Sequence, residues 1–331
     1  MRVNWSSVPL PEQYEGVPAS HVGGHPRDKF MGKNSNDIDI VVSGVTPEEM
    51  LNRGFTHIMS SEDNENVPVF VDDMGREVAI ARSEISTGDG YDEFEMDIVD
   101  PSLSHKEALK RDLERRDLTI NAISVNIRTG EVYDPFNGLD DIERGIIRHV
   151  SPAFAEDPLR VLRAARYAIR FGFDIHKDTL DMMKSLSDKI SALPDDRFGL
   201  ELMKALSQGQ NPRRYFDILY EVNALDKAYP NIADLKSVPA GPQEYHQEGS
   251  AYEHTMRVLN EMYEIRGNDT EALLAALFHD IGKTQTDDEI LPHHYNHEKN
   301  GKYLAEEIRK NLQINRDYKG VMSLSARTHG N

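Results

Sequence analysis

The chain has 331 residues, no cysteine and a formal net charge of −19, with 38% hydrophobic and 29% charged residues. This length allows two or three domains, and the missing cysteines exclude disulfides and thiolate metal sites and favour a reducing, cytoplasmic location. The N-terminus is not signal-like and no apolar run approaches about 20 residues, so we expect neither secretion nor membrane spanning. The acidic balance argues against a general nucleic-acid binder, and no protein partner is evident.

The charge is unevenly distributed along the chain. Residues 62–100 carry thirteen acids against Arg76 and Arg82, whereas residues 144–170 carry six arginines against two acids. A local cationic surface on an acidic body suits one docked polyanion and discourages loose binding elsewhere.

The first 150 residues predict a small mixed sheet with helices, which we take as the first domain. Short apolar runs are separated by turn signals and by short helical patterns, as in an α+β unit. The acidic, glycine-containing stretch 83–104 shows no period and is expected to be a mobile loop. The predicted strands are 17–22, 37–42, 67–71 and 77–81, the last two forming a hairpin.

Two acids open the second of these strands. Residues i and i+2 of a strand face the same side, so Asp37 and Asp39 are expected to project together while Ile38 and Ile40 turn inward. Two carboxylates on one face repel each other unless a cation, such as a divalent metal, lies between them. The preceding pair Gly23-Gly24 lets backbone N–H groups approach a phosphate closely. Metal and phosphate together predict nucleotidyl or phosphoryl transfer.

Strand patterns disappear from about residue 150, and helices are predicted over 158–171, 178–190, 197–207 and 212–221. Asp157 and Pro158 are a suitable N-cap and first-turn residue for the first of these helices. An arginine stripe runs down that helix at spacings of three, three and four, within about a third of its circumference at about 100° per residue. Its members are Arg160, Arg163, Arg166 and Arg170. A solvated basic face is the alternative interpretation of this stripe.

An acid beside an arginine can select nucleobases. A carboxylate accepts from an amino group and a guanidinium donates to a ring nitrogen, and cytosine and adenine both present that pair on their Watson–Crick edges. Uracil and guanine present a carbonyl acceptor and an N–H donor at these positions, so the same acid and arginine would reject them. Asp157 and Arg160, with Glu156 holding Arg160, are therefore candidates for reading C and A without a nucleic-acid template. Arg163 and Arg166 are expected to face phosphates or ribose.

The last third of the chain contains a second candidate site. An apolar helix over 273–278 ends in the pair His279-Asp280, and His254 lies earlier in the chain, just before another helical pattern. Imidazole and carboxylate are suitable ligands for a divalent metal. The alternative is a structural helical body whose histidines cap helices or accept hydrogen bonds.

These motifs resemble a known family. The Gly-Gly and Asp-x-Asp spacing is similar to that of nucleotidyltransferases of the polymerase-β superfamily. In detail the chain resembles the bacterial-type (class II) tRNA CCA-adding enzymes and poly(A) polymerases. The motifs that carry this are Arg115-Arg116-Asp117-Leu118-Thr119-Ile120-Asn121-Ala122, Tyr133-Asp134-Pro135-Phe136-Asn137-Gly138-Leu139-Asp140-Asp141 and Glu156-Asp157-x-x-Arg160. Residues 254–283 resemble HD-domain metal phosphohydrolases, although no clear final Asp ligand follows.

The resemblance implies a polymerase-β-like head (1–150), an all-α neck for base recognition (151–225) and a helical body with an HD-like domain (226–331). It implies a catalytic Mg²⁺ pair held by Asp37 and Asp39, with Glu77 a weak candidate for a third acid. Gly24, Arg27 and Arg116 would cradle the triphosphate, and Asp117 would lie near the ribose or orient an arginine. A second divalent metal would bind His254, His279 and Asp280.

The implied activity is template-independent addition or repair of the 3′-terminal CCA of tRNA from CTP and ATP, with release of pyrophosphate. The partners are then the tRNA 3′ end and the two nucleotides. A bacterial-type poly(A) polymerase shares the head and neck motifs and is the nearest alternative. The others are an HD phosphohydrolase or 2′,3′-cyclic phosphodiesterase with a degenerate head, and a non-catalytic tRNA-binding module.

Overall fold

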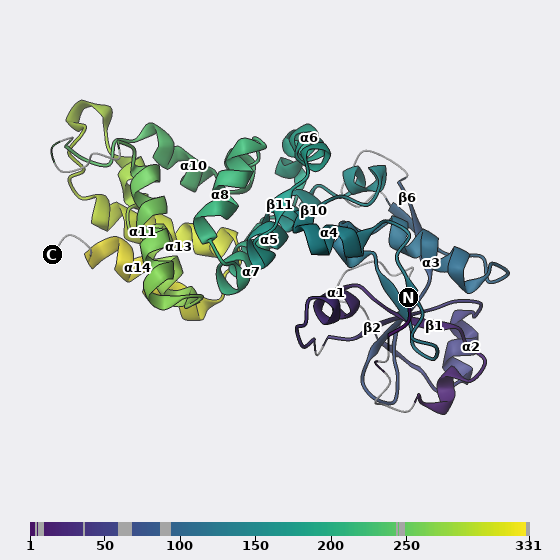
Figure 1. Ribbon diagram of the computed structural model, residues 1–331. Coiled ribbons are helices and arrows are strands. Elements are labelled where there is room, and N and C mark those ends of the chain that lie inside the picture. Colours follow the sequence, from purple (N-terminus) through teal and green to yellow (C-terminus); the bar gives the residue numbers. More distant parts are fainter. Residues whose placement is uncertain are drawn as a thin grey trace. The chain divides into compact units, whose positions relative to one another are not determined.

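The computed structural model describes residues 1–3, 5, 10–35, 37–58, 68–86, 94–242, 244 and 249–328. The chain divides into two compact units, Met1–Asp157 and Pro158–Asn331, which are described separately (Figure 1). The first unit contains the head predicted over residues 1–150. A further division of the second unit at residue 225 stays a prediction.

A seven-stranded mixed sheet forms the centre of the first unit, in the order β3-β4-β5-β2-β1-β8-β9. Strand β2 pairs antiparallel with β1 and parallel with β5, so it lies in the middle of the sheet. The strands are β1 (Ala19–Val22), β2 (Asp39–Val42), β3 (Thr56–Ile58), β4 (Val69–Val71), β5 (Glu77–Ile80), β8 (Ser124–Asn126) and β9 (Val132–Tyr133).

Helices and short connections complete this unit. Helix α2 (Pro47–Asn52) begins at a capping box between Thr46 and Glu49, and helix α3 (His105–Glu114) at one between Ser104 and Glu107. Such reciprocal bonds satisfy N–H groups that the first turn leaves free. The remaining elements are α1 (Gly24–Phe30), α4 (Gly138–Arg144), β10 (Ile146–Ile147) and the 3-10 helices Glu12–Tyr14, Thr119–Asn121 and Pro152–Glu156.

The two faces of the sheet bury separate apolar clusters. Ile40 and Val42 pack into one cluster with Ile38 at its margin, as the alternation of β2 predicts. Val41 faces the other cluster, together with Val22 and with Leu109 from α3. Because Asp39 is two residues before Val41, the pleat directs its side chain to this second face.

One predicted loop is wrong at its ends. Strands β6 (Arg82–Ser86) and β7 (Phe94–Ile98) pair antiparallel within the stretch 83–104, and residues 87–93 lie outside the described part. The sequence alternates polar residues with Ile85 on one strand and with Phe94, Met96 and Ile98 on the other. Alternation with a period of two favours a strand, but the many acids in this stretch led to the prediction of a loop.

The described residues of the second unit form helices and one two-residue strand, β11 (Asp174–Ile175). Its helices are α5 (Leu159–Phe171), α6 (Lys177–Leu186), α7 (Asp195–Gln208), α8 (Pro212–Glu221), α9 (Leu225–Ala228), α10 (Pro230–Asp234), α11 (Ala251–Arg266), α12 (Thr270–Phe278), α13 (His297–Asn311) and α14 (Lys319–Thr328). Short 3-10 helices occupy Ser187–Ala192, Leu235–Ser237, Ile281–Gln285, Asp288–Ile290 and Arg316–Tyr318. These helices confirm the α-helical prediction for this half.

Helix α5 begins one residue later than predicted. Its N-cap is Pro158, which makes no side-chain capping hydrogen bond, so the prediction of Asp157 as the cap is wrong. Its apolar residues Leu162, Ala165 and Ile169 are buried, as the helical period predicts. None of the helices in the described part of the chain combines the length and hydropathy that a membrane-spanning segment requires.

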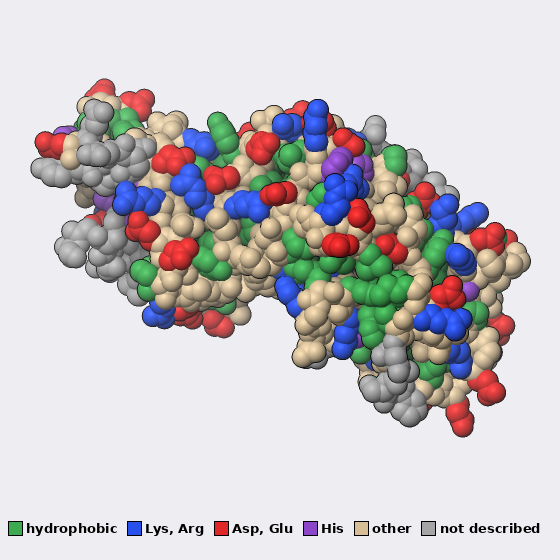
Figure 2. All heavy atoms as spheres, viewed as in Figure 1, with side chains coloured by type: hydrophobic (Ala, Val, Ile, Leu, Met, Phe, Trp, Pro, Cys, Tyr) green, Lys and Arg blue, Asp and Glu red, His purple; other side chains and the backbone are tan. Residues whose placement is uncertain are grey.

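Acidic and basic side chains are interspersed on the face of the molecule that Figure 2 shows. The excess of acids lies mainly in the first unit, because residues 1–157 carry 31 acids against 15 lysines and arginines, whereas residues 158–331 carry 26 against 23.

Candidate active site

Three acids gather where strands β2 and β5 begin. Asp39 is the first residue of β2, and its register partner on the parallel strand β5 is Glu77. Asp37 precedes the strand and is exposed, whereas Asp39 is half-buried. The strand therefore starts two residues later than predicted. Glu77 was only a weak candidate from the sequence because its pairing with Asp39 depends on the sheet register.

The electrostatics around Asp39 favour a cation. Burial and the nearby carboxylates of Asp37 and Glu77 raise the pKa of Asp39 to about 6, while Arg116 and Arg27 act in the opposite direction. A divalent cation between these oxygens would relieve the repulsion and favour the ionised form of Asp39.

The glycine pair leaves space directly beside this acid. Gly23 has φ +70°, a backbone conformation that side chains rarely adopt. A Cβ added to Gly23 would lie 3.2 Å from Oδ2 of Asp39 and 3.0 Å from Nη1 of Arg116. A Cβ on Gly24 would lie 3.3 Å from Nη2 of Arg27. The missing side chains therefore let a carboxylate and two guanidinium groups lie close to the glycine backbone, an arrangement that we call the cradle.

A chain of buried hydrogen bonds fixes Arg27. Its Nε donates to Asp28 at 2.7 Å and its Nη1 donates to Oδ1 of Asn121 at 2.5 Å. The amide of Asn121 in turn donates to Oδ1 of Asp117 at 2.9 Å. This chain favours the role of Asp117 as an arginine orienter, and Asn121 is the link that sequence reasoning did not single out.

Residues 134–141 hold in place the turn that carries Asn121. The Asp134 carboxylate accepts from the backbone N–H groups of Gly138 and Leu139 at 2.8 and 2.9 Å. A Cβ on Gly138 would lie 2.2 Å from the carbonyl oxygen of Thr119, so only glycine fits there. The Thr119 hydroxyl donates to the buried Asp141 at 2.7 Å. Residues 134–141 therefore fix the Thr119–Asn121 turn, and this turn carries the Asn121 side chain that accepts from Arg27.

The predicted base-reading residues fall on both sides of the division between the units. Glu156 ends a 3-10 helix, Asp157 follows it, and Arg160 lies in the first turn of α5. Arg160 is 8% exposed, so this end of the stripe is not a solvated face. The joint role of these three residues stays a prediction.

Within the second unit, Arg166 is held by a buried ion pair. Its Nε donates to Oε2 of Glu201 on α7 at 2.6 Å, and its guanidinium lies 4.3 Å from the ring centroid of Tyr167. Arg163 is half-buried and lies 5.7 Å from the same ring centroid. Arg166 therefore contributes to helix packing, and its assignment to the nucleotide stays a prediction.

The second candidate site is assembled from α11 and the end of α12. Ligand atoms of His254, His279 and Asp280 all lie within 4.8 Å of one another. Nδ1 of His279 lies 2.8 Å from the carbonyl oxygen of Ala276, which directs Nε2 toward Asp280, 3.2 Å from its Oδ2. A backbone partner of this kind commonly orients a metal-binding histidine.

Two further side chains reach Asp280. Lys283 Nζ lies 2.7 Å from its Oδ2, and His297 Nε2, from the start of α13, lies 3.9 Å from its Oδ1. Sequence reasoning did not select His297, although it lies in a histidine-rich run. The site therefore offers three imidazoles and one carboxylate, a donor set that suits a divalent transition ion.

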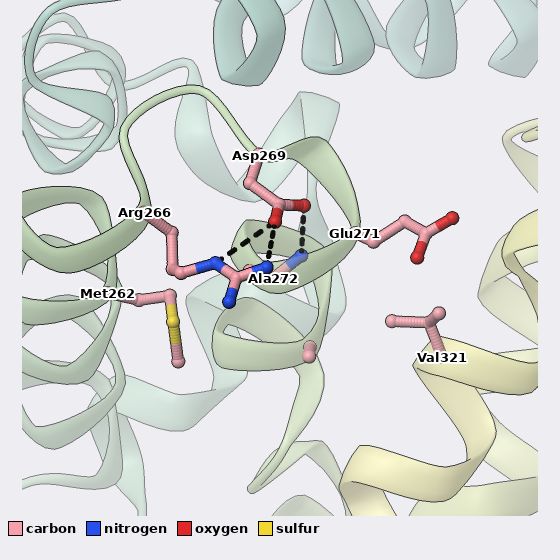
Figure 3. Close-up of a pocket in the computed structure, with 7 residues that line it drawn as sticks. Met262, Arg266, Asp269, Glu271, Ala272 and Val321 are labelled. Atoms are coloured by element: carbon pink, nitrogen blue, oxygen red, sulfur yellow. Dashed lines mark hydrogen bonds and ion pairs between the residues drawn. The ribbon is translucent and has the colours of Figure 1, made fainter.

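A separate hollow of about 360 Å³ lies on the second unit between α11, α12 and α14 (Figure 3). Its lining is mainly apolar, and two of its polar side chains, Arg266 and Asp269, are paired with each other. Asp269 accepts from Arg266 at 2.7 Å and from the backbone N–H of Ala272 at 3.2 Å, which caps α12. None of the predicted site residues lines this hollow.

Comparison with known families matches three successive parts of the chain. Residues 19–148 match the poly A polymerase head domain, residues 172–236 a probable RNA- and SrmB-binding site of polymerase A, and residues 251–326 an HD domain.

Similar whole proteins carry one name. The chain is 41% identical over 311 residues to the multifunctional CCA protein of Nitrosococcus oceani, covering 93% of this chain and 73% of that protein. It is 43% identical over 290 residues to the protein of that name from Pasteurella multocida, covering 85% of this chain and 66% of that protein.

Solved structures share the fold. A tRNA-processing enzyme complex aligns with a TM-score of 0.62 at 22% identity, covering 96% of this chain and 77% of that one. A CCA-adding enzyme in complex with ATP aligns with a TM-score of 0.58 at 22% identity, covering 93% of this chain and 64% of that one.

Proposed function

Because the chain belongs to the multifunctional CCA protein family of nucleotidyltransferases, we propose that it adds or repairs the 3′-terminal CCA of tRNA, using CTP and ATP and releasing pyrophosphate. The observation that carries the proposal is the cradle beside Gly23, where Asp39 and Arg116 face the same space. A carboxylate for a metal and a guanidinium for phosphate are the two groups that nucleotidyl transfer requires.

Enzymes of this family depend on a divalent metal, and we propose Mg²⁺ here. Asp37, Asp39 and Glu77 fit such an ion, because burial and the two neighbouring carboxylates raise the pKa of Asp39, and carboxylate oxygens are the ligands Mg²⁺ prefers. When bound, the metal activates the tRNA 3′-hydroxyl and neutralises charge on the reacting phosphates.

The chain's own residues bind and orient the nucleotide. Gly23 and Gly24 leave room for the triphosphate, and Arg27 and Arg116 neutralise it from two sides. Arg27 is pre-oriented by Asp28 and by Asn121, so little conformational entropy is lost on binding. The selection of C and A stays a prediction from the sequence motif Glu156-Asp157-x-x-Arg160.

The test uses tRNA lacking its terminal CCA and labelled CTP as the only nucleotide. The proposed enzyme incorporates C, and the double variant Asp37→Ala/Asp39→Ala does not. Absence of C incorporation, together with long A tails in a parallel reaction with ATP alone, would instead identify a poly(A) polymerase. Retention of the principal activity by the double variant would point to the HD region.

The cluster around Asp280 favours a second candidate function. We propose that it binds a divalent metal and hydrolyses a phosphoester, such as a 2′,3′-cyclic phosphate, independently of the head. The double variant His279→Ala/Asp280→Ala should lose metal-dependent phosphodiesterase activity and keep C incorporation. A cytoplasmic location stays a prediction.

A further inference from the structure

Asp112, on helix α3, is a fully buried carboxylate shared between two arginines. Its side chain is 0% exposed. Its Oδ1 lies 2.9 Å from Nη2 of Arg115, and its Oδ2 lies 3.0 Å from Nη2 of Arg116. Burying a carboxylate is costly unless it is paired and hydrogen-bonded. Burial raises the pKa of Asp112, but the two guanidinium groups outweigh this and hold the pKa below its ordinary value.

The direction of the Arg116 side chain depends on this carboxylate. Its Nη2 donates to Asp112, whereas its buried Nε has no hydrogen-bond partner among the residues that the structure describes. Its Nη1 lies 3.0 Å from the Cβ position of Gly23, in the cradle beside Asp39. The guanidinium thus spans from the buried carboxylate to the space where the triphosphate is proposed to bind.

We propose that Asp112 is a positioning residue for the triphosphate of the incoming nucleotide, acting through Arg116. The inference rests on the proposed function, since it assigns the ligand of Arg116 as a nucleoside triphosphate. Asp112 itself is too deeply buried to touch that ligand. Because CTP and ATP share the triphosphate, the effect of Asp112 is the same for both nucleotides, unlike that of a base-reading residue.

A purely structural role for Asp112 predicts something different. Asp112 also accepts a long hydrogen bond, 3.4 Å, from the backbone N–H of Arg82 at the start of β6. If its task were only to join α3 to β6, its loss would weaken the binding of every ligand of the head, with or without β- and γ-phosphates.

The experiment compares equilibrium dissociation constants of ATP, CTP and AMP in Mg²⁺ for the full chain and the variant Asp112→Asn. We expect the Kd for ATP and for CTP to rise by the same factor, about 10- to 100-fold, which is the range for one charge-assisted hydrogen bond. The Kd for AMP should stay within about twofold, because AMP lacks the phosphates that Arg116 is proposed to contact.

Two further variants separate positioning from folding. Asp72→Asn is a matched control, because Asp72 is also buried and paired with an arginine at 2.7 Å, and this arginine, Arg76, is not among the side chains near the Cβ positions of Gly23 and Gly24. It should lower the melting temperature and leave the ATP-to-AMP affinity ratio unchanged. Asp112→Glu keeps the negative charge, and should reduce that ratio less than Asp112→Asn does.

A double-mutant cycle gives the decisive comparison. In an Arg116→Gln background, Asp112→Asn should cause no further loss of ATP affinity. An equal loss of ATP and AMP binding, an additive loss in the cycle, or an unchanged ATP affinity in Asp112→Asn would each overturn the role of Asp112. If the wild type binds ATP no better than AMP, the proposed triphosphate site itself fails.

Discussion

Asp39 and Glu77 occupy paired positions on the two parallel strands β2 and β5, so two carboxylates from segments 38 residues apart face the same space. Their proximity contributes to the raised pKa of Asp39. The pairing makes Glu77 a member of the candidate metal site and not merely a polar residue at a strand start.

Glu77→Gln should reduce nucleotidyl transfer by about 10- to 100-fold at low Mg²⁺, and by less at saturating Mg²⁺, because one carboxylate of the site is lost. The measurement is the initial rate of C incorporation as a function of Mg²⁺ concentration. Asp73→Asn changes an exposed acid in the turn before β5 and should leave this dependence unchanged. An identical Mg²⁺ dependence in Glu77→Gln and the wild type would remove Glu77 from the site.

Gly23→Ala should abolish nucleotide binding as well as reduce stability. The new Cβ would lie in the cradle between Asp39 and Arg116, and φ +70° adds about 1 kcal/mol of backbone strain. Gly32→Ala is the matched control, because Gly32 also has φ +70° but no atom within 4 Å of its Cβ position. Both variants should melt at lower temperature, and only Gly23→Ala should lose ATP affinity. Equal ATP affinity in the two variants would contradict the location of the cradle.

Stability should fall in acid partly because of His21. Burial, with the positive charges of His25 and Arg76 nearby, lowers the pKa of His21 to about 4, from 6.5 in the unfolded chain. The unfolded state therefore binds more protons between these values. The contribution of His21 is complete above pH 6.5 and is lost as the pH falls to about 4.

The corresponding variant is His21→Leu, which cannot be protonated. The free energy of unfolding, measured in urea at pH 7 and pH 5, should decrease less in the variant than in the wild type. The same decrease in both proteins would show that His21 does not titrate as its burial implies.

Glu201→Gln should destabilise the second unit by about 3–5 kcal/mol, because it leaves the Arg166 guanidinium buried without its anion. Arg166 and Glu201 are 3% and 2% exposed, so water cannot replace the lost partner. The measurement is thermal unfolding of the full chain. Arg257→Gln, which removes an exposed pair with Glu261, should change the melting temperature little. A similarly small change in Glu201→Gln would contradict the importance of the buried pair.

His297→Ala should weaken divalent metal binding at the second site by about 10- to 100-fold. Titration with Co²⁺, followed by its visible absorption and by calorimetry, measures this without any substrate. His293→Ala, from the same histidine-rich run, should bind Co²⁺ as the wild type does. If the two variants have equal affinity, His297 is not part of the site.

The candidate site could be proposed from the sequence where its residues lie close together in the chain. The spacing of Asp37 and Asp39, the glycine pair and the arginine stripe are visible within short windows. The pairing of Asp39 with Glu77 is not, because it depends on a parallel register between distant strands. For the same reason, the sequence did not show that Asn121 links Arg27 to Asp117, or that Glu201 holds Arg166.

Element boundaries were less predictable than element types. The β6–β7 hairpin was hidden because its acidic composition resembles that of a loop, and cross-strand hydrogen bonding outweighs that preference. Asp157 was expected to cap α5, but Pro158 takes that position. The α+β type of the first half and the α-helical type of the second could be predicted from the spacing of hydrophobic residues. This spacing is a signal summed over many positions, so single exceptions do not change it.

The central claim is tested most directly by the sequence of the product formed from tRNA lacking its 3′ end, with all four nucleoside triphosphates present. The account predicts the addition of C, C and A in that order, followed by termination. Tails of A alone, incorporation of U or G, or products that are unaffected by Asp37→Ala/Asp39→Ala would contradict it.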